Sequence, residues 1–349
     1  MGSTLAGCNF SEGSIMQTAT LIGIDLGKYS FHVHCQDRQG NALLRKKFSR
    51  SQLATFLATY PACTVIMESC AGAHYMARTV SQLGHRVKLI APQFVRPFVK
   101  SNKNDFVDAE AICEAASRPS MRFVTPRTED QQAMSALHRV RSSLIRERVK
   151  TTNQIHAFLL EFGISLPRGS AVIKRLPSVL EENGIPPDLE RLLARLHTHY
   201  GYLSEQIKEI DNELKTHLNE DETAQRLLTI PGVGPVTASL LATRLGDGKN
   251  YASSRDFAAS TGLVPRQDST GGKPTLMGIS KRGNKVLRSL LVQCARAFMR
   301  RLEHNSGRLA EWVKKQLASH HSNVVACALA NKLARIAWAV TAHQTEFSK

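Results

Sequence analysis

Residues 19–27, Ala-Thr-Leu-Ile-Gly-Ile-Asp-Leu-Gly, join a short apolar run to a carboxylate and a glycine at its end. Such a run predicts a buried strand that delivers Asp25 to the edge of a sheet. The residues that follow alternate between strand and helix patterns, so we predict an α/β layer domain over residues 19–125. Strands are expected at 19–24, 31–35, 42–48, 64–67 and 86–90, and helices at 51–59, 73–83, 94–100 and 106–116.

The size and charge of the chain restrict the classes of protein it can belong to. A length of 349 residues favours two or three domains, and 42% hydrophobic residues exclude a wholly disordered chain. The 46 Lys and Arg against 29 Asp and Glu leave a net charge of +17, which favours a polyanionic partner.

The positive charge is concentrated at the two ends of the chain. Residues 1–125 carry 14 basic and 8 acidic side chains, residues 126–220 carry 13 of each, and residues 221–349 carry 19 and 8. A neutral middle between two basic ends predicts two nucleic-acid-facing modules joined by a structural element, with solvated surface charge as the alternative.

The cysteines and the first residues of the chain indicate the cellular compartment in which the protein acts. The seven cysteines are odd in number and form no CxxC pair, so neither a disulfide framework nor a zinc site is indicated, and a reducing compartment is expected. Residues 1–18 lack a basic start followed by an apolar stretch, so we predict a disordered leader rather than a secretory signal. The sequence contains no run of eighteen apolar residues, and no membrane span is expected.

Two long helices are predicted in residues 126–220, after a linker flanked by Pro119 and Pro126. In the second helix, two apolar rows repeat every seven positions with offsets of three and four, the a/d seam of a coiled coil. These rows are Leu196, Leu203 and Ile210, and Leu193, Tyr200, Ile207 and Leu214. The first helix has a weaker row, Leu137, Leu144 and Phe158, interrupted by Thr151. An antiparallel helical hairpin and a coiled-coil dimer arm both fit this pattern.

Residues 221–349 are predicted to form a mainly helical domain. The run 230–235, Ile-Pro-Gly-Val-Gly-Pro, followed by an apolar helix over 236–245, is the pattern of a helix-hairpin-helix motif. Gly232 and Gly234 would allow a tight turn that aims backbone N–H groups at a phosphate, although a ligand-free helix connection is the alternative. A loop rich in Gly, Pro, Ser and Thr is expected over 261–283, and two or three amphipathic helices over 285–343.

Four carboxylates in the first domain form a candidate metal site. Asp25 and Glu68 each follow an apolar strand, and they would meet if the first and fourth strands are neighbours. Asp105 and Asp108 begin a helix at a spacing of three, which places both on one helical face. Four converging carboxylates repel one another unless cations neutralise them, so we predict two magnesium ions that serve phosphoryl transfer. Taken singly, Asp25 could be a turn residue, and Asp105 or Asp108 a helix N-cap.

One other enzyme class shares part of this pattern. Gly-Ile-Asp-Leu-Gly also resembles the first phosphate loop of actin-like ATPases and sugar kinases. Such an enzyme should carry a second Asp- and Gly-rich phosphate loop and an adenosine motif, and the sequence contains neither.

The motifs together resemble a known family. They are residues 23–27, residues 104–109 (Asn-Asp-Phe-Val-Asp-Ala), residues 230–235 and the stretch from Gly262 to Asn284. In this order they are similar to the DEDD insertion-sequence transposases related to the Piv invertase, which are guided by a bridge RNA. The resemblance covers residues 19–342.

The resemblance implies a fold and a set of roles. It implies a RuvC-like, ribonuclease-H-like domain carrying the tetrad Asp25, Glu68, Asp105 and Asp108, then a coiled-coil arm, then a transposase domain. A nucleophilic serine falls on Ser269, with Thr270 and Ser280 as the nearby alternatives. It also implies action in the bacterial cytoplasm at the nucleoid, and a site assembled from different subunits of a dimer that builds to a tetramer on DNA.

Basic residues crowd the same loop and the helix after it. Side chains at this spacing read phosphates rather than bases, so they are expected to position nucleic acid without specifying its sequence. They are Lys273, Lys281, Arg282, Lys285 and Arg288. Aromatic residues make up only 6% of the chain, which argues against extensive base stacking. Sequence choice would then come from RNA pairing.

The sequence therefore predicts a magnesium-dependent, RNA-guided DNA recombinase that forms a covalent phosphoserine intermediate. A RuvC-like Holliday-junction nuclease that activates water is one alternative. A non-catalytic, structure-specific nucleic-acid-binding protein is the other.

Overall fold

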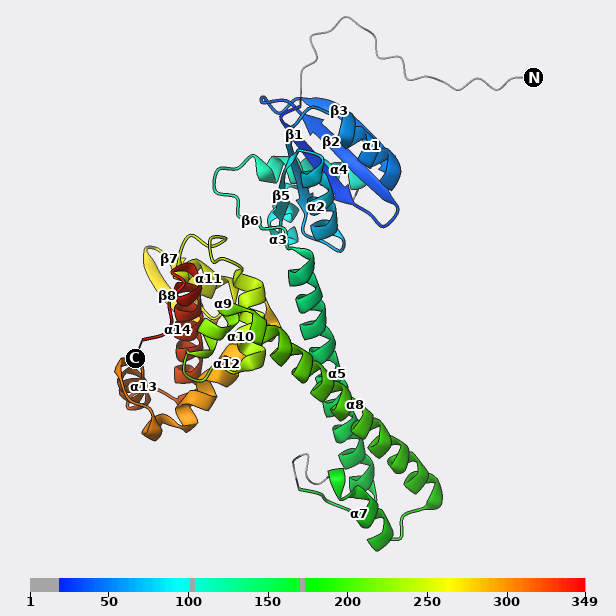
Figure 1. The fold of residues 1–349 in the computed structure, drawn as a ribbon, viewed down its shortest axis with the longest axis vertical. Coiled ribbons are helices and arrows are strands. Elements are labelled where there is room, and N and C mark those ends of the chain that lie inside the picture. The colour runs from blue at the N-terminus through cyan, green and yellow to red at the C-terminus, as the bar shows by residue number, and fades with distance from the viewer. Residues whose placement is uncertain (1–18, 101–103, 168, 170–172, 349) are drawn as a thin grey trace, which may run out of the picture. The chain divides into compact units, whose positions relative to one another are not determined.

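A computed structural model describes residues 19–100, 104–167, 169 and 173–348 (Figure 1). The chain divides into two units, the first ending at Thr128 and the second beginning at Glu129. The leader predicted over residues 1–18 lies outside the described residues.

The first unit is built on a six-stranded mixed sheet (Figure 1). The strands lie in the order β3-β2-β1-β4-β5-β6; β1, β4 and β5 are parallel, and the other neighbours are antiparallel. Their bounds are β1 Leu21–Leu26, β2 Ser30–Gln36, β3 Ala42–Ser49, β4 Thr64–Glu68, β5 Arg86–Ile90 and β6 Phe123–Val124. The five predicted strands are confirmed within a few residues, and β1 and β4 are neighbours.

Helices cover both faces of this sheet. Helices α1 (Arg50–Thr59) and α2 (Ala73–Gln82) pack on one face, where an apolar cluster joins them to alternate residues of β1 and β2. Helix α4 (Asp105–Ala116) lies on the opposite face with α3 (Pro92–Val95), in a second cluster that includes Ile66. Side chains alternate between the two faces of a strand. The residues of β1 and β2 next to those buried under α1 and α2 are therefore directed toward α4.

The second unit begins with a long antiparallel helical pair, α5 (Glu129–Glu161) and α8 (Pro187–Glu220) (Figure 1). Arg141 on α5 pairs with Asp211 on α8, and the far end of α5 packs with the beginning of α8 and with α7 (Leu176–Glu182). Seven residues of α8 are buried: Leu193, Tyr200, Leu203, Ile207, Ile210, Leu214 and Leu218. Six of the seven residues of the two predicted rows are therefore confirmed as buried, and Leu196 packs against the cluster.

The rest of the second unit is a helical bundle around the largest apolar cluster of the described chain. Its helices are α9 Glu222–Leu228, α10 Pro235–Leu245, α11 Ser254–Ser260, α12 Lys285–Arg300, η2 Leu302–His304, α13 Arg308–Leu317 and α14 Ser322–Ala342. By length and composition α14 could cross a membrane, but half of its apolar window is buried. The core helix of a globular protein passes the same test, so this is weak evidence for a span.

Three local expectations are wrong. The predicted helix at 94–100 is two short pieces, α3 and η1 (Arg96–Phe98), because Pro97 interrupts it. Phe158 is 41% exposed while Ile155 and Leu159 are buried, so the contact face of α5 departs from the predicted row at Phe158. The expected irregular loop at 261–283 contains a β-hairpin, β7 (Pro265–Thr270) and β8 (Lys273–Ile279), which turns at two glycines with positive φ.

Candidate catalytic and metal site

Two parallel strands bring the first pair of carboxylates to one edge of the sheet. Ile24 of β1 is in register with Met67 of β4, and Asp25 and Glu68 are the next residues on these strands. Ile66 faces α4, so Glu68, two positions later, is directed to the same face. The predicted meeting of these strand ends is confirmed by the strand pairing.

The second pair of carboxylates comes from the first turn of α4. Asn104 caps this helix, its side-chain oxygen accepting a hydrogen bond from the N–H of Phe106 at 3.0 Å. The helix approaches β1 closely at Gly23, where a β-carbon would lie 2.5 Å from the carbonyl oxygen of Ala109. Glycine at this position therefore allows α4 to pack onto the strand that carries Asp25.

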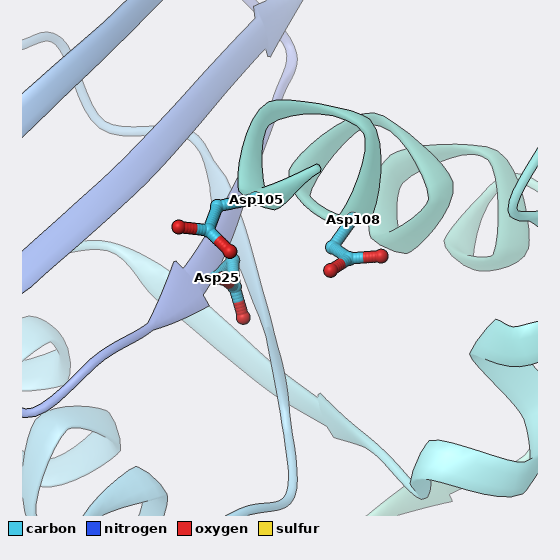
Figure 2. Close-up of side chains that lie close together, drawn as sticks. All are labelled: Asp25, Asp105 and Asp108. Carbon is cyan, nitrogen blue, oxygen red and sulfur yellow. The ribbon is translucent and has the colours of Figure 1, made fainter. Parts of the chain in front are cut away.

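These elements gather three of the carboxylates into one cluster. Asp25 at the end of its strand faces Asp105 and Asp108 from the helix (Figure 2). One carboxylate oxygen from each residue lies within 4.8 Å of the others. Asp25 and Asp108 are half-buried, and Asp105 is exposed. The three residues thus form an acidic cluster that is open to solvent on one side.

Glu68 is coupled to this cluster electrostatically. Burial raises the pKa of the Glu68 carboxyl, and the charges of Asp25 and Asp108 raise it further, while Arg96 opposes them. Burial also raises the pKa of the neighbouring Cys70 thiol, and the charges of Glu68 and Asp25 add to that effect. Burial is the larger cause of both shifts, and the repulsion between neighbouring negative groups adds to it.

The residues present fit a hard divalent cation. Carboxylate oxygens are the ligands that Mg²⁺ and Mn²⁺ prefer in proteins, and three of them lie within reach of a single ion. A cation would relieve the repulsion that raises the pKa of Glu68. The donor set is therefore suited to an ion of this class.

A histidine that the sequence reasoning did not single out contacts the cluster. His32 on β2 lies opposite Asp25 in the antiparallel register, and its Nδ1 is 3.5 Å from Oδ2 of Asp105. The available signal was the alternation of residues 31–36, Phe-His-Val-His-Cys-Gln, which places the polar side chains on one face of the strand.

Ser269 lies in the second unit, on the exposed hairpin β7–β8. It pairs with Pro274 across the hairpin, and the side-chain amide of Gln267 donates a hydrogen bond to its Oγ at 2.8 Å. Every residue of β7 is exposed. The hydroxyl is therefore presented on a surface hairpin, and Thr270 occupies the last position of the same strand.

The predicted nucleic-acid contacts lie in three settings. Lys273 is exposed on β8, and Lys281, Arg282 and Lys285 are not buried. The Nη1 of Arg288 donates a hydrogen bond to the carbonyl oxygen of Thr261 at 3.0 Å, at the base of the hairpin.

The two glycines before α10 face different surroundings. At Gly232 a β-carbon would lie 2.7 Å from the carbonyl oxygen of Cys294, so packing against α12 by itself accounts for the glycine. The space around Gly234 is open to a β-carbon.

Most of the chain is similar in sequence to known transposases. Residues 22–164 match a family described as DEDD transposases of the IS110 type, and residues 224–311 match the transposase IS116/IS110/IS902 family. The chain is 78% identical to the transposase for insertion sequence element IS1328 of Yersinia enterocolitica, over 96% of this chain and all of that protein. It is 38% identical to the IS1111A transposase of Coxiella burnetii, over 95% and 92% of the two chains. A pilin gene-inverting protein of Moraxella bovis is 23% identical over 76% and 75%.

Proposed function

The chain belongs to the IS110 family of insertion-sequence transposases, which cut and rejoin DNA, and from this premise we propose that it does so through a covalent phosphoserine intermediate. The acidic residues Asp25, Glu68, Asp105 and Asp108 would assist, and Ser269 would be the nucleophile. The observation that carries this proposal is the convergence of Asp25, Asp105 and Asp108 within 4.8 Å, in a chain that matches DEDD transposases over this region.

The serine step conserves the energy of the DNA backbone. The Oγ of Ser269 attacks the scissile phosphorus, so an Oγ–P bond forms as the P–O bond to the departing strand end breaks. The serine hydroxyl loses its proton and the departing oxygen gains one. Because one phosphoester bond replaces another, a hydroxyl of a second DNA strand can reverse the step and rejoin the DNA.

The acidic cluster supplies the cation site that such a reaction needs. Mg²⁺ held by this cluster together with Glu68 would stabilise charge on the attacking and leaving oxygens, and a pair of ions is expected. A serine hydroxyl is a poor nucleophile at neutral pH, and the stretch from Gly262 to Asn284 contains no histidine to activate it. We therefore assign the activation to the carboxylate site, brought together with Ser269 in the assembled recombinase.

We propose that a guide RNA recognises the DNA sequence and that the basic side chains contact phosphates. The net charge of +11 over residues 221–349 and the 6% aromatic content support backbone contacts rather than base readout. Lys273, Lys281, Arg282, Lys285 and Arg288 are the residues proposed to make these contacts. The proposed assembly is a dimer through the helical pair of residues 126–220 that builds to a tetramer on DNA, with a RuvC-like fold in the first domain.

A suicide DNA substrate tests the proposal. The protein is purified with its co-purifying RNA, given Mg²⁺ and a substrate whose nicked strand diffuses away, and analysed for a protein–DNA adduct on a denaturing gel. We expect an adduct from the wild-type protein, none from Ser269→Ala, and an unchanged adduct from Ser280→Ala.

The other outcomes identify the alternative functions. Cleavage without an adduct, retained in Ser269→Ala, would indicate a nuclease that uses water as its nucleophile. Binding of branched DNA without cleavage, unaffected by Asp25→Ala, would indicate a structure-specific binding protein. An adduct lost in Thr270→Ala but kept in Ser269→Ala would identify Thr270 as the nucleophile.

A further inference from the structure

His32 contacts the acidic cluster from the strand beside Asp25. The two residues face each other in the β1–β2 register, and Nδ1 of His32 lies 3.5 Å from Oδ2 of Asp105. His32 therefore lies between the strand that carries one carboxylate and the helix that carries two others.

The imidazole ring is held on two sides. Its side chain is only 7% exposed, and its ring meets the ring of Phe106 edge to face with centroids 4.8 Å apart. Phe106 directly follows Asp105 in the first turn of α4. A buried ring between a strand and a helix turn has few orientations open to it, so the direction of its Nδ1 is fixed.

Asp105, in contrast to His32, is exposed to solvent. Its side chain is 55% exposed, and it is the first residue of α4. A carboxylate in water samples several rotamers, and holding it in one of them costs conformational entropy when a ligand binds. An N–H group held beside one of its oxygens would reduce that cost before the ligand arrives.

We propose that His32 is a positioning residue of the cation site: its Nδ1–H holds the Asp105 carboxylate toward Asp25 and Asp108 and thereby strengthens divalent-cation binding. This inference rests on the cation site of the proposed function. Partners of this kind, which orient a ligand without touching the ion, typically contribute about 10- to 100-fold to metal affinity.

The same strand offers a matched control. His34 is on the same face as His32, is 2% exposed, and lies opposite Gly23 rather than opposite a carboxylate. Among the residues that the structure describes, its Nδ1 is buried without a hydrogen-bond partner. Replacing His34 by leucine therefore perturbs the packing of β2 under α4 without removing a contact to the acidic cluster.

The test measures binding of Mn²⁺ to the full-length protein without nucleic acid, by electron paramagnetic resonance titration of the free ion. His32→Leu and His32→Met remove the N–H and fill the space with two different shapes. His32→Asn keeps an N–H near the position of Nδ1. We expect the Mn²⁺ dissociation constant to rise about tenfold or more in the apolar variants, and to stay within about threefold of wild type in His32→Asn and His34→Leu.

A double-mutant cycle distinguishes an effect through Asp105 from a general disturbance. In the Asp105→Asn background, His32→Leu or His32→Met should change Mn²⁺ affinity little further, because the carboxylate that the histidine orients is gone. Full additivity, equal losses in His32→Asn and the apolar variants, or wild-type affinity in a folded apolar variant would each overturn the proposal. Failure of every His32 variant to fold would also overturn it, since the ring would then serve the packing of β2. Absence of Mn²⁺ binding in the wild-type protein would instead refute the cation site itself.

Discussion

The imidazole Nε2 of His138 on α5 lies 3.1 Å from the hydroxyl oxygen of Ser239 on α10. The ring is 4% exposed, and burial, together with the charges of Arg141 and Arg244, lowers the pKa of His138 to about 4. The long helix α5 is thus attached to the helical bundle of the second unit through a neutral histidine.

This contact makes stability depend on pH. The unfolded chain binds a proton at His138 below its ordinary pKa of 6.5, whereas the folded chain binds it only near pH 4. Stability should therefore fall as the pH drops from about 6.5 to 4, by up to about 3 kcal/mol for this group. Urea unfolding at several pH values between about 6.5 and 4 measures the slope of the free energy of unfolding against pH.

His138→Gln should flatten that slope, and His304→Gln, at an exposed position, should leave it unchanged. Burial also lowers the pKa of His34, with the same sign, so part of the slope should remain in His138→Gln. An unaltered slope in His138→Gln would show that this histidine does not carry the effect.

Gly23→Ala should damage both the first unit and its site. The added β-carbon would lie 2.5 Å from the carbonyl oxygen of Ala109 and from the Sγ of Cys113, so α4 must move away from β1. We expect a loss of about 1–3 kcal/mol in the free energy of unfolding, as for other overpacked sites, and weaker cation binding because Asp105 and Asp108 move with α4. Denaturant unfolding and Mn²⁺ titration measure the two effects.

Gly201→Ala is the control for that substitution. The space around Gly201, in the middle of α8, is open to a β-carbon, so alanine should stabilise the protein by up to about 1 kcal/mol. Equal stability of Gly23→Ala and the wild-type protein would contradict the close approach of α4 to β1.

Asp108→Asn should lower the activity of the protein without lowering its stability. Removing one negative charge from the cluster relieves repulsion, so the melting temperature without divalent cations should stay the same or rise, and RNA binding should persist. DNA cleavage should fall by about 100-fold or more, since the loss of a ligand from the proposed cation site would remove several kcal/mol of transition-state stabilisation. Asp105→Asn should likewise lower cleavage by about 100-fold or more and leave RNA binding intact.

Glu114→Gln on the same helix is the control for the loss of a carboxylate. Glu114 pairs with Lys100 and Arg118 rather than with the cluster, so its replacement should leave cleavage near the wild-type level. Wild-type cleavage in Asp108→Asn, measured on the same substrate, would argue against a role in cation binding.

Local patterns were sufficient for much of this structure. The apolar runs before Asp25 and Glu68 predicted strands that end at one edge, and the seven-residue rows predicted the buried face of α8, because burial follows periodicity within an element. The alternation around His32 indicated two different faces of β2. It could not show which face α4 covers, because that depends on the contact of Gly23 with a helix more than eighty residues later.

The hairpin of Ser269 was missed for a different reason. Its strands are polar and exposed, so no alternating apolar pattern distinguishes them from a loop, although Gly271 and Gly272 form a recognisable turn. Its base depends on contacts between segments about twenty residues apart, such as the hydrogen bond from the N–H of Lys281 to the carbonyl oxygen of Gly262.

Gly283→Ala should disturb the hairpin at this base. Gly283 has a φ of +95°, and a β-carbon there would lie 1.9 Å from the carbonyl oxygen of Ser260, so alanine is both strained and in collision with backbone. We expect the proposed phosphoserine adduct to fall by about tenfold or more, because each 1.4 kcal/mol lost in positioning Ser269 costs a factor of ten. Gly272→Asn, at the turn where the space around the glycine is open, should retain most of the adduct, since asparagine tolerates positive φ. Adduct formation in Gly283→Ala equal to that of the wild-type protein would show that the base of the hairpin does not position the serine.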